Sequence, residues 1–499
     1  MKILLILLKI LIIKVLALIA YYNNLNNFFV SEDLVQVWDT DFYFLLRQFF
    51  PNRVTGYRPV MFIWWWLGYI LYGYTPFAFR WIILLLHIVN SVIVLVIVKS
   101  VTQSSIIGLI SSIIYLPMVV HSDAINWISA ASNQITCGFF FLSTVYTYIR
   151  YKKTNYKNKK LLAICIATMI LAMSANEIAL TLPIALLGTD IVIKNKSDRK
   201  ILELFHWRYF GFILLAWFIF IVWRALAVRG IGGYGASVHL RVGDFLLQTS
   251  EAIARMLLLP WSEFVVVSNL ISDVFSNLII LAFVLLALCA ILWSGRVGLV
   301  VMFASLLPVL NIPAYHRLYV PAAGFAIAIG ITLGALLYFS RRWLRMASSA
   351  MVLLILVFNS TYQYHALSSR NQDWSKASRV TLTVVRQTVS LVPNPPRDSV
   401  FYYHGLPKNL GNGVQVFNWG LRQALQAAYN DRSLKGFRVK KVIDTPYNLE
   451  RSLDQVLQQK DLNIAVYFLI FDINKMELRL SSKEEFVYVV STSSLGPEY

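Results

Sequence analysis

The feature that most constrains this chain is a series of long apolar runs that contain almost no charge. Phe210 to Trp223 and Leu278 to Trp293 approach the length that a helix needs to cross roughly 30 Å of hydrocarbon. Several such runs occur, and the mean hydropathy is +0.62. These properties exclude an ordinary soluble enzyme, a disordered chain and a disulfide scaffold, and they predict an α-helical polytopic membrane protein.

The basic residues give a prediction of topology. The net charge is +20, but the lysines and arginines lie mainly in short clusters between apolar runs, which is typical of orientation signals in a bilayer. We therefore expect no nucleic-acid partner. The strongest cluster, Arg150 to Lys160, is expected to face the cytoplasm. Counting in both directions from it predicts about eleven transmembrane helices and a cytoplasmic N-terminus.

The composition changes near residue 365, where the apolar density falls and prolines cluster soon afterwards at Pro393, Pro395 and Pro396. We predict a transmembrane domain over residues 1–364 and a small extracytoplasmic α/β accessory domain over residues 365–499. Its periodicity predicts helices at 373–391, 418–429 and 448–459, and strands at 399–403, 437–442 and 464–470.

Acidic residues before Tyr364 collect in segments that this topology places outside the cytoplasm. Glu32 and Asp33 come just past the first predicted span, and we select them as general base and as ligands of a divalent cation such as Mg or Mn. A carboxylate can accept a hydroxyl proton while the acceptor attacks a sugar carbon. A neighbouring cation can neutralise the departing phosphate.

Other polar residues stand at the ends of apolar runs. Glu177 lies in a hairpin too short to lift its side chain far into water. His121 and Asp123 follow another run and can supply a metal ligand or a proton acceptor. His316 and Arg317 interrupt a further run, where a fixed guanidinium can grip a phosphate at two points. Together these positions predict an outward-facing polar cavity.

The order of these motifs resembles the GT-C superfamily of integral membrane glycosyltransferases. The resemblance is greatest to the branch of transmembrane, tetratricopeptide-repeat O-mannosyltransferases and their bacterial relatives, although no such repeat follows here. It covers roughly the first 365 residues. The strings that carry it are 29–33, 57–60, 69–76, 84–90, 121–129, 174–183, 230–235, 306–312 and 316–321.

The resemblance implies an inverting glycosyltransferase that moves a sugar from a polyprenyl-phosphate donor to a protein, lipid or glycan acceptor. The reaction would take place on the extracytoplasmic face of the plasma (inner) membrane of a prokaryote. On this analogy Asp33 with Glu32 is the catalytic acidic pair, His121 with Asp123 the second-loop motif, and Glu177 the hairpin acid. The donor phosphate would be held by Arg58 and by Arg317 with its neighbour His316, and Asp123 would join Glu32 and Asp33 at the metal.

The sequence departs from this family at two positions. The first pair is Glu-Asp where relatives often have Asp-Asp, and Asn176 stands where a lysine is common. Two alternatives from other functional classes stay open. One is a transporter or flippase of lipid-linked saccharides, which would also need a polar cavity. The other is a catalytically inactive membrane scaffold.

Overall fold

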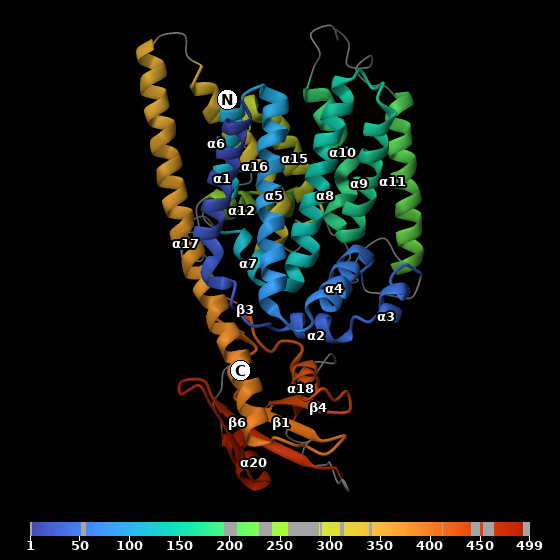
Figure 1. Cartoon of the computed structure of the whole chain (residues 1–499), viewed down its shortest axis with the longest axis vertical. Coiled ribbons are helices and arrows are strands. Elements are labelled where there is room, and N and C mark those ends of the chain that lie inside the picture. The colour runs from blue at the N-terminus through green and yellow to red at the C-terminus, as the bar shows by residue number, and fades with distance from the viewer. Residues whose placement is uncertain are drawn as a thin grey trace. The chain divides into compact units, whose positions relative to one another are not determined.

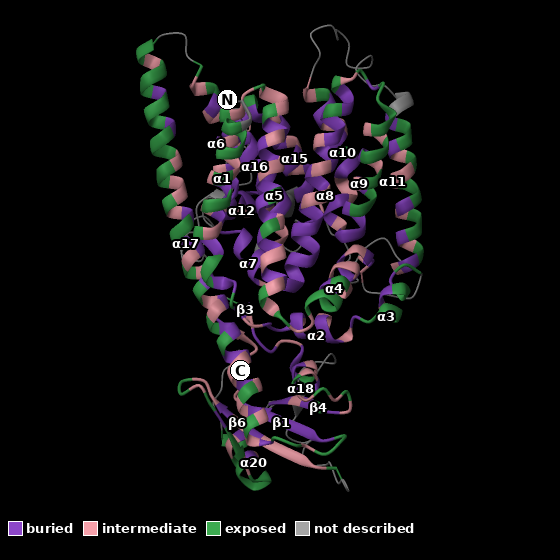
Figure 2. Ribbon diagram, in the orientation of Figure 1, coloured by how far each residue is buried: buried purple, intermediate pink, exposed green. Residues whose placement is uncertain are grey.

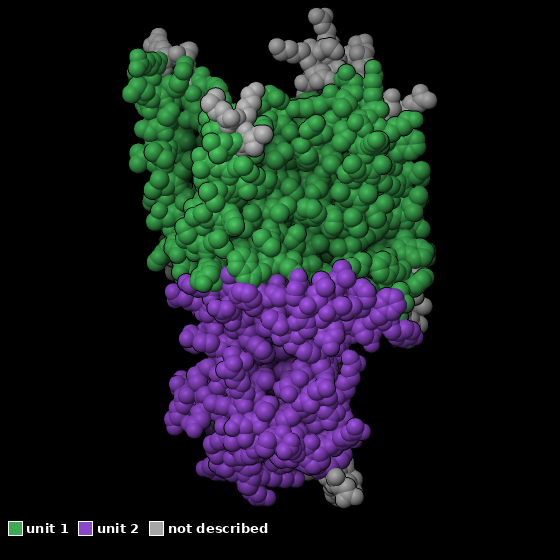
Figure 3. Space-filling model, in the orientation of Figure 1, with its two compact units in different colours: residues 1–22, 45–64, 80–370 green, residues 23–44, 65–79, 371–499 purple. Residues whose placement is uncertain are grey.

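The chain divides into two compact units, each assembled from segments far apart in sequence (Figure 3). Unit 1 comprises Met1–Tyr22, Leu45–Trp64 and Arg80–Arg370, and unit 2 comprises Asn23–Phe44, Trp65–Phe79 and Asn371–Tyr499. The computed structural model describes residues 2–50, 56–193, 207–228, 242–257, 289, 292–309, 314–338, 342–411, 413–440, 450–452 and 464–492. The division predicted between residues 364 and 365 stays a prediction. The structure adds that segments 23–44 and 65–79 belong to the unit that contains the C-terminal sheet.

Unit 1 is helical (Figure 1). Its elements are α1 (Lys2–Tyr21), α6 (Ser105–Tyr115), α7 (His121–Asn126), α8 (Ile128–Lys153), α9 (Lys159–Ala175), η2 (Glu177–Thr181), α10 (Leu182–Val192), α11 (Trp207–Val228), α12 (Val242–Leu257), η3 (Leu292–Gly295), α15 (Arg296–Leu306), η4 (Tyr315–Leu318) and α16 (Tyr319–Leu336). The elements η1 (Tyr22–Asn24), α3 (Phe42–Arg47), α4 (Pro59–Tyr72), α5 (Pro76–Thr102) and α17 (Arg342–Leu391) contain residues of both units.

Among the described residues, five helices are long and apolar enough to cross a membrane: Leu4–Asn24, Pro76–Thr102, Phe210–Val228, His316–Leu336 and Arg342–Leu391. Figure 2 shows much of α11 and of the first half of α17 as exposed, whereas α16 is mostly buried. The exposed side chains include large apolar ones such as Phe218 and Leu354. A surface of this kind suits lipid rather than water. The predicted count of about eleven spans stays a prediction, because segments such as 258–288 lie outside the described residues.

Glycines bring α15 and α16 into close contact. A Cβ added to Gly324 of α16 would lie 2.3 Å from the Met302 backbone nitrogen of α15, and one added to Gly298 would lie 2.3 Å from the Ala328 nitrogen. Small residues let membrane helices approach until their backbones touch, which increases dispersion contacts where no hydrophobic effect separates helix from lipid. This contact fixes the start of α16, close to the predicted His316 and Arg317.

Unit 2 contains a five-stranded sheet with strand order β5-β4-β1-β6-β7. Its strands are β1 (Val400–His404), β4 (Lys435–Lys440), β5 (Glu450–Ser452), β6 (Val466–Asp472) and β7 (Glu477–Ser481); only β7 runs antiparallel to its neighbour. The remaining elements are α2 (Glu32–Asp39), the β2 (Asn409–Leu410) and β3 (Val414–Gln415) hairpin, α18 (Leu421–Tyr429) and α20 (Lys483–Thr492).

Aromatic side chains alternate between the two faces of the central strand β1. Tyr402 stacks between Phe437 and Phe468 on the face that α20 covers with Phe486. The Tyr403 hydroxyl on the other face is bonded to Thr388 of α17 at 2.9 Å. This period of two is the expected burial pattern of a strand that is covered on both sides.

The strands predicted at 399–403, 437–442 and 464–470 are confirmed within a few residues by β1, β4 and β6, and the helix predicted at 418–429 is confirmed by α18. The helix predicted at 448–459 is wrong where the structure describes it, because Glu450–Ser452 forms the edge strand β5. Parallel pairing of Arg438 with Glu450 supplies hydrogen-bond partners that helical periodicity could not reveal. The rest of that predicted helix lies outside the described residues.

Candidate active site

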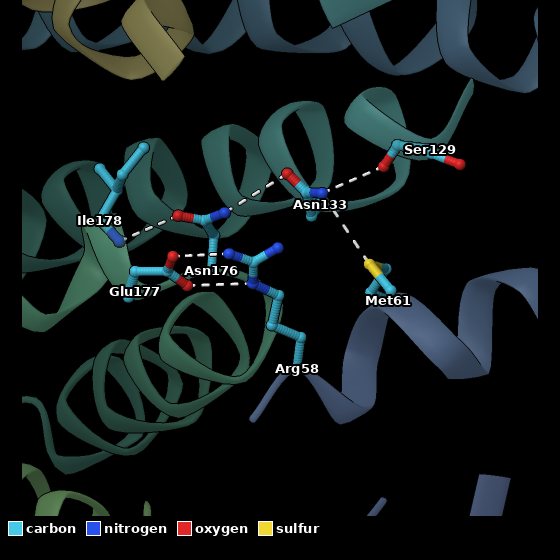
Figure 4. Close-up of polar contacts among 7 residues, drawn as sticks. All are labelled: Arg58, Met61, Ser129, Asn133, Asn176, Glu177 and Ile178. Carbon is cyan, nitrogen blue, oxygen red and sulfur yellow. Dashed lines mark hydrogen bonds and ion pairs between the residues drawn. The ribbon is translucent and has the colours of Figure 1, made fainter. Parts of the chain in front are cut away.

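Two residues with separate predicted roles, Arg58 and Glu177, form one ion pair in unit 1 (Figure 4). Arg58 immediately precedes α4, and Glu177 is the first residue of η2. Arg58 Nε donates to Glu177 Oε2 at 3.0 Å and Arg58 Nη2 donates to Oε1 at 2.5 Å. Their side chains are only 13% and 21% exposed. A two-point contact of this kind fixes the plane of the guanidinium as well as its position.

The turn that presents Glu177 is held by amides. Asn176 is extended, and its Oδ1 accepts from the Ile178 backbone N–H at 3.0 Å, which caps η2. Asn176 Nδ2 donates to Asn133 Oδ1 of α8 at 3.3 Å, and Asn133 Nδ2 donates to the Ser129 carbonyl at 3.0 Å (Figure 4). The asparagine that departs from the family pattern therefore has a structural role here. Asn133 was not predicted, because nothing in the sequence distinguishes it from other polar residues of α8.

A second guanidinium acts on the same carboxylate. Arg224 of α11 is only 4% exposed, and its Nε and Nη1 have no hydrogen-bond partner among the described residues. Burial alone would raise the pKa of Glu177, but the charge and hydrogen bonds of Arg58, together with the charge of Arg224, lower that pKa to about 2. Among the described residues, two guanidiniums, those of Arg58 and Arg224, thus act on the single carboxylate of Glu177, an arrangement that can also bind an anion.

Sequence reasoning missed Arg224, because it lies inside a run interpreted as a membrane span. The signal was nevertheless present. A single arginine in an otherwise apolar membrane helix is costly, so it marks a candidate functional site by default.

Asp123 of the predicted second-loop motif is also paired. Arg370 of α17 donates from Nε to Asp123 Oδ1 at 2.9 Å and from Nη2 to Oδ2 at 3.0 Å. Both side chains are largely buried, with 10% and 12% exposure. Both carboxylate oxygens of Asp123 thus contact a guanidinium. Arg370 was not predicted, since it lies almost 250 residues further along the chain.

His121 has different neighbours from Asp123. It is fully buried, and its ring lies 4.5 Å from that of Tyr115, 4.8 Å from that of Tyr319 and 5.0 Å from that of His87, measured between centroids. Neither ring nitrogen of His121 has a hydrogen-bond partner among the described residues. Burial in this cluster, with a smaller effect of His87, lowers the pKa of His121 well below its ordinary value. The side chain is therefore neutral at physiological pH.

The tautomers in this cluster follow from its hydrogen bonds. His87 Nε2 lies 3.1 Å from the Leu116 carbonyl, which can only accept, so this nitrogen carries the proton. His87 Nδ1 must then accept from the Tyr319 hydroxyl at 2.8 Å, while Asn90 Nδ2 donates to the same hydroxyl at 3.0 Å. The cluster ties α5, α6 and α16 together around His121.

His316 and Arg317 occupy the short helix η4. The His316 ring packs edge-on against Trp127, with centroids 5.4 Å apart and an interplanar angle of 86°. Trp127 links α7 to α8, so His316 lies beside the segment that carries His121 and Asp123. The structure therefore brings these two motifs into one region of unit 1.

Asp33 and Glu32 belong to unit 2 and form the first turn of α2. Asp33 is completely buried, and its Oδ2 accepts from the Val30 backbone N–H at 3.3 Å. Glu32 is half-buried. The residue before this pair, Ser31, has a φ of 48°, a conformation that non-glycine residues rarely adopt and that occurs often at functional sites.

Residues near the C-terminal sheet hold this turn in place. The Ser31 backbone N–H donates to the Val416 carbonyl at 2.8 Å, and Ser31 Oγ donates to Gln415 Oε1 at 3.2 Å. Gly420 has a φ of +83°, and a Cβ there would lie 2.4 Å from the Ser31 carbonyl oxygen. The C-terminal part of the chain therefore positions the predicted catalytic pair, a role that the sequence did not indicate.

The predicted metal ligands do not form one cluster within a unit. Among residues that the structure describes, no group of three or more His, Cys, Asp or Glu could hold a metal ion. Glu32 and Asp33 lie in unit 2 and Asp123 in unit 1, where both of its oxygens already accept from Arg370. Asp123 therefore fits the role of a metal ligand poorly.

No known protein family matches this sequence, and no curated protein is significantly similar to it. Among solved structures, the chain is similar to ArnT from Cupriavidus metallidurans bound to undecaprenyl phosphate, with 11% identity, a TM-score of 0.48 and coverage of 98% of this chain and 96% of that one. ArnT in the apo state is 10% identical, with a TM-score of 0.49 and coverage of 97% of this chain and 94% of that one. The oligosaccharyltransferase of Archaeoglobus fulgidus is 12% identical, with a TM-score of 0.46 and coverage of 85% of this chain and 63% of that one. Identity at this level transfers no residue role.

Proposed function

We propose that the protein is an inverting glycosyltransferase that moves a sugar from a polyprenyl-phosphate-linked donor to a protein, lipid or glycan acceptor. The site would face the extracytoplasmic side of a prokaryotic plasma membrane. The observation that carries the proposal is the pair of buried guanidiniums, Arg58 and Arg224, that act on the Glu177 carboxylate in a chain with long apolar helices. A phosphate attached to a lipid is an anion that reaches such a place with its tail still in the bilayer.

In this proposal the chain supplies a base and an anion-binding group. Asp33 accepts the proton of the acceptor hydroxyl while that oxygen attacks the anomeric carbon of the sugar. The bond from this carbon to the phosphate oxygen breaks, and the polyprenyl phosphate leaves with the electron pair. Arg224 and Arg58 stabilise the charge that develops on the phosphate, and Glu177 holds the Arg58 guanidinium in a fixed orientation.

A divalent cation, Mg²⁺ or Mn²⁺, at Glu32 and Asp33 stays a prediction, and no step above requires it. Such an ion would neutralise part of the phosphate charge when bound. Chelation with EDTA followed by re-addition of each metal tests this point. Full activity in EDTA would remove the metal from the proposal and leave the two arginines as the only phosphate-binding cations in it.

The decisive test compares the full-length protein with Asp33→Asn and with Asp39→Asn, both in detergent. Asp39 makes a matched control, because it lies on the same helix and bonds to Gln423 Nε2 at 3.0 Å. The assay measures release of radiolabelled sugar from polyprenyl-phosphate donors with and without candidate acceptors. We expect turnover of one donor, a loss of about 10²–10⁴-fold in Asp33→Asn and near-normal turnover in Asp39→Asn.

Two results would contradict the proposal. Equal turnover by wild type and Asp33→Asn would remove the assigned base. Binding of every donor without turnover, even with acceptors present, would favour the transporter or the inactive scaffold. Proteoliposomes distinguish these two, because a transporter moves the intact donor between leaflets and a scaffold does not.

A further inference from the structure

A second charged site lies away from the cluster described above, at the C-terminal ends of α5 and α8. The C-terminal ends of both helices belong to unit 1 and lie at the same edge of the bundle (Figure 1). Between their ends is a cavity of about 440 Å³, within the roughly 300–1,000 Å³ usual for small-ligand sites. It is lined by Val96, Lys99, Ser100, Gln103, Tyr146, Arg150, Lys153 and Thr154.

The lining carries three cations and no acid. Within the described part of the chain, Lys99, Arg150 and Lys153 form no ion pair. Arg150 Nη1 donates to the Tyr146 hydroxyl at 3.1 Å, which leaves most of the guanidinium donors for another acceptor. Burial, and to a lesser degree the charge of Arg150, lower the pKa of Lys153, so these cations repel each other. An anion in the cavity would relieve that repulsion.

The C-terminal ends of helices attract cations through the helix dipole, and this attraction accounts for part of the arrangement. Lys153 Nζ donates to the Ser100 carbonyl at the end of α5, a favourable contact with the negative end of the helix dipole. The preceding residue in the chain, Lys152, shows the contacts of a cation with a purely structural role. Lys152 is buried and paired with Asp190 Oδ1 at 2.9 Å. Among the described residues, no acid forms an ion pair with Lys99, Arg150 or Lys153 in this way.

The position of the cavity indicates the kind of anion. It lies at the end of α5, a 27-residue helix of the length and composition needed to span a membrane, at the level where lipid headgroups lie. Val96 and the ring of Tyr146 add apolar walls beside the charges. Basic pockets between membrane helices on the cytoplasmic side suit phosphate headgroups, and the Lys and Arg pattern predicts that side for this end.

We propose that this cavity binds the phosphate headgroup of an anionic phospholipid, phosphatidylglycerol or cardiolipin, from the surrounding leaflet. Lys99, Arg150 and Lys153 contact the phosphate oxygens, and Ser100, Gln103 and Thr154 are polar neighbours around it. The site is independent of the proposed sugar transfer, so its test needs no donor and no activity measurement.

The test uses purified full-length protein, stripped of lipid in a neutral detergent and titrated with single lipid species, with bound lipid counted by native mass spectrometry. Wild type should bind phosphatidylglycerol and cardiolipin in preference to phosphatidylcholine. The triple variant Lys99→Gln, Arg150→Gln, Lys153→Gln should lose about five-fold in affinity for each cation removed, or roughly 100-fold in all. The preference of wild type needs no variant, so a failure of the triple variant to fold leaves the proposal testable.

A control variant separates a built site from diffuse charge. Lys157, Lys159 and Lys160 are exposed, lie near the same end of α8 and α9, and line no part of the cavity. Changing these three to Gln removes the same amount of charge. We expect lipid affinity within about two-fold of wild type, because lysines outside the cavity attract lipid through a charged membrane surface, and a neutral micelle has none. Equal losses in both triple variants, or no headgroup preference in wild type, would overturn the proposal. Displacement of the lipid by inorganic phosphate at low concentration would also overturn it, by pointing to a free phosphate ligand.

Discussion

Replacement of Glu177 by Gln should destabilise the protein more than replacement of Arg58 by Gln, although the two residues are partners. The reason is Arg224, whose charge interacts favourably with Glu177 and unfavourably with Arg58. Glu177→Gln removes the carboxylate on which the buried guanidiniums of Arg58 and Arg224 both act. Arg58→Gln leaves Glu177 with the charge of Arg224. Among the described residues, Arg224 Nε and Nη1 have no hydrogen-bond partner, so both atoms can form new hydrogen bonds.

The magnitude follows from two independent arguments. Removal of one partner of a buried ion pair costs about 3–5 kcal/mol, because the other charge stays buried. The fall of the Glu177 pKa from 4.5 to about 2 corresponds to roughly 3 kcal/mol of favourable interaction. We therefore expect a loss of about 3–5 kcal/mol for Glu177→Gln. For Arg58→Gln we expect about 1–3 kcal/mol, the value of charge-assisted hydrogen bonds partly replaced by Arg224.

The assay is thermal unfolding in detergent, followed by the fluorescence of the 14 tryptophans, for wild type, both single variants and the double variant. The double variant removes one cation from the overcharged Glu177→Gln site, so it should melt at a higher temperature than Glu177→Gln alone. In an Arg224→Gln background the difference between the two single changes should shrink, because each change then leaves one charge of the pair without the other. The reasoning is refuted if Arg58→Gln melts below Glu177→Gln, or if the double variant is the least stable of the set.

Three further outcomes are expected. The carboxylate of Glu177 stabilises the fold fully above pH 4.5, so the difference in melting temperature between wild type and Glu177→Gln should close as the pH falls from 4.5 to about 2; a constant difference would contradict the assigned pKa. Gly420→Ala and Gly413→Ala should each lose about 1–2 kcal/mol of stability, because both glycines have a positive φ. Of these two, only Gly420 lies against the Ser31 carbonyl just before α2, so sugar transfer should fall in Gly420→Ala and not in Gly413→Ala. Arg370→Lys keeps the charge but not both hydrogen bonds to Asp123, so a loss of about 1.5–3 kcal/mol is expected in thermal unfolding; melting like wild type would show that the two-point geometry is unimportant.

Much of the secondary structure is determined locally and could be predicted. Apolar runs of about twenty residues predict helices because an unsatisfied backbone group in lipid is too costly for any other structure. The strands β1, β4 and β6 were predicted for a related reason, since alternating and aromatic-rich runs fit a half-buried sheet. The edge strand β5 was mispredicted as a helix, because its pairing with β4 depends on a segment that ends ten residues earlier.

The candidate residues were also partly predictable, because a charged group at the end of an apolar run is costly and therefore conspicuous. This argument selected Glu177, Asp123 and the acidic pair Glu32 and Asp33 from the sequence alone. The same argument should have selected Arg224, which was overlooked because it lies inside a run rather than at its end.

The partners of these residues were decided only by the tertiary structure. Arg58 and Glu177 are 119 residues apart, and Asp123 and Arg370 are 247 apart, so no local pattern relates them. The attachment of the Asp33 turn to Val416 and Gly420 likewise joins opposite ends of the chain. The sequence by itself determined which side chains are too costly to be accidental, because that cost depends on the apolar residues next to them. Which charge compensates which depends on how the helices pack, and that arrangement follows from many weak contacts spread over the whole chain.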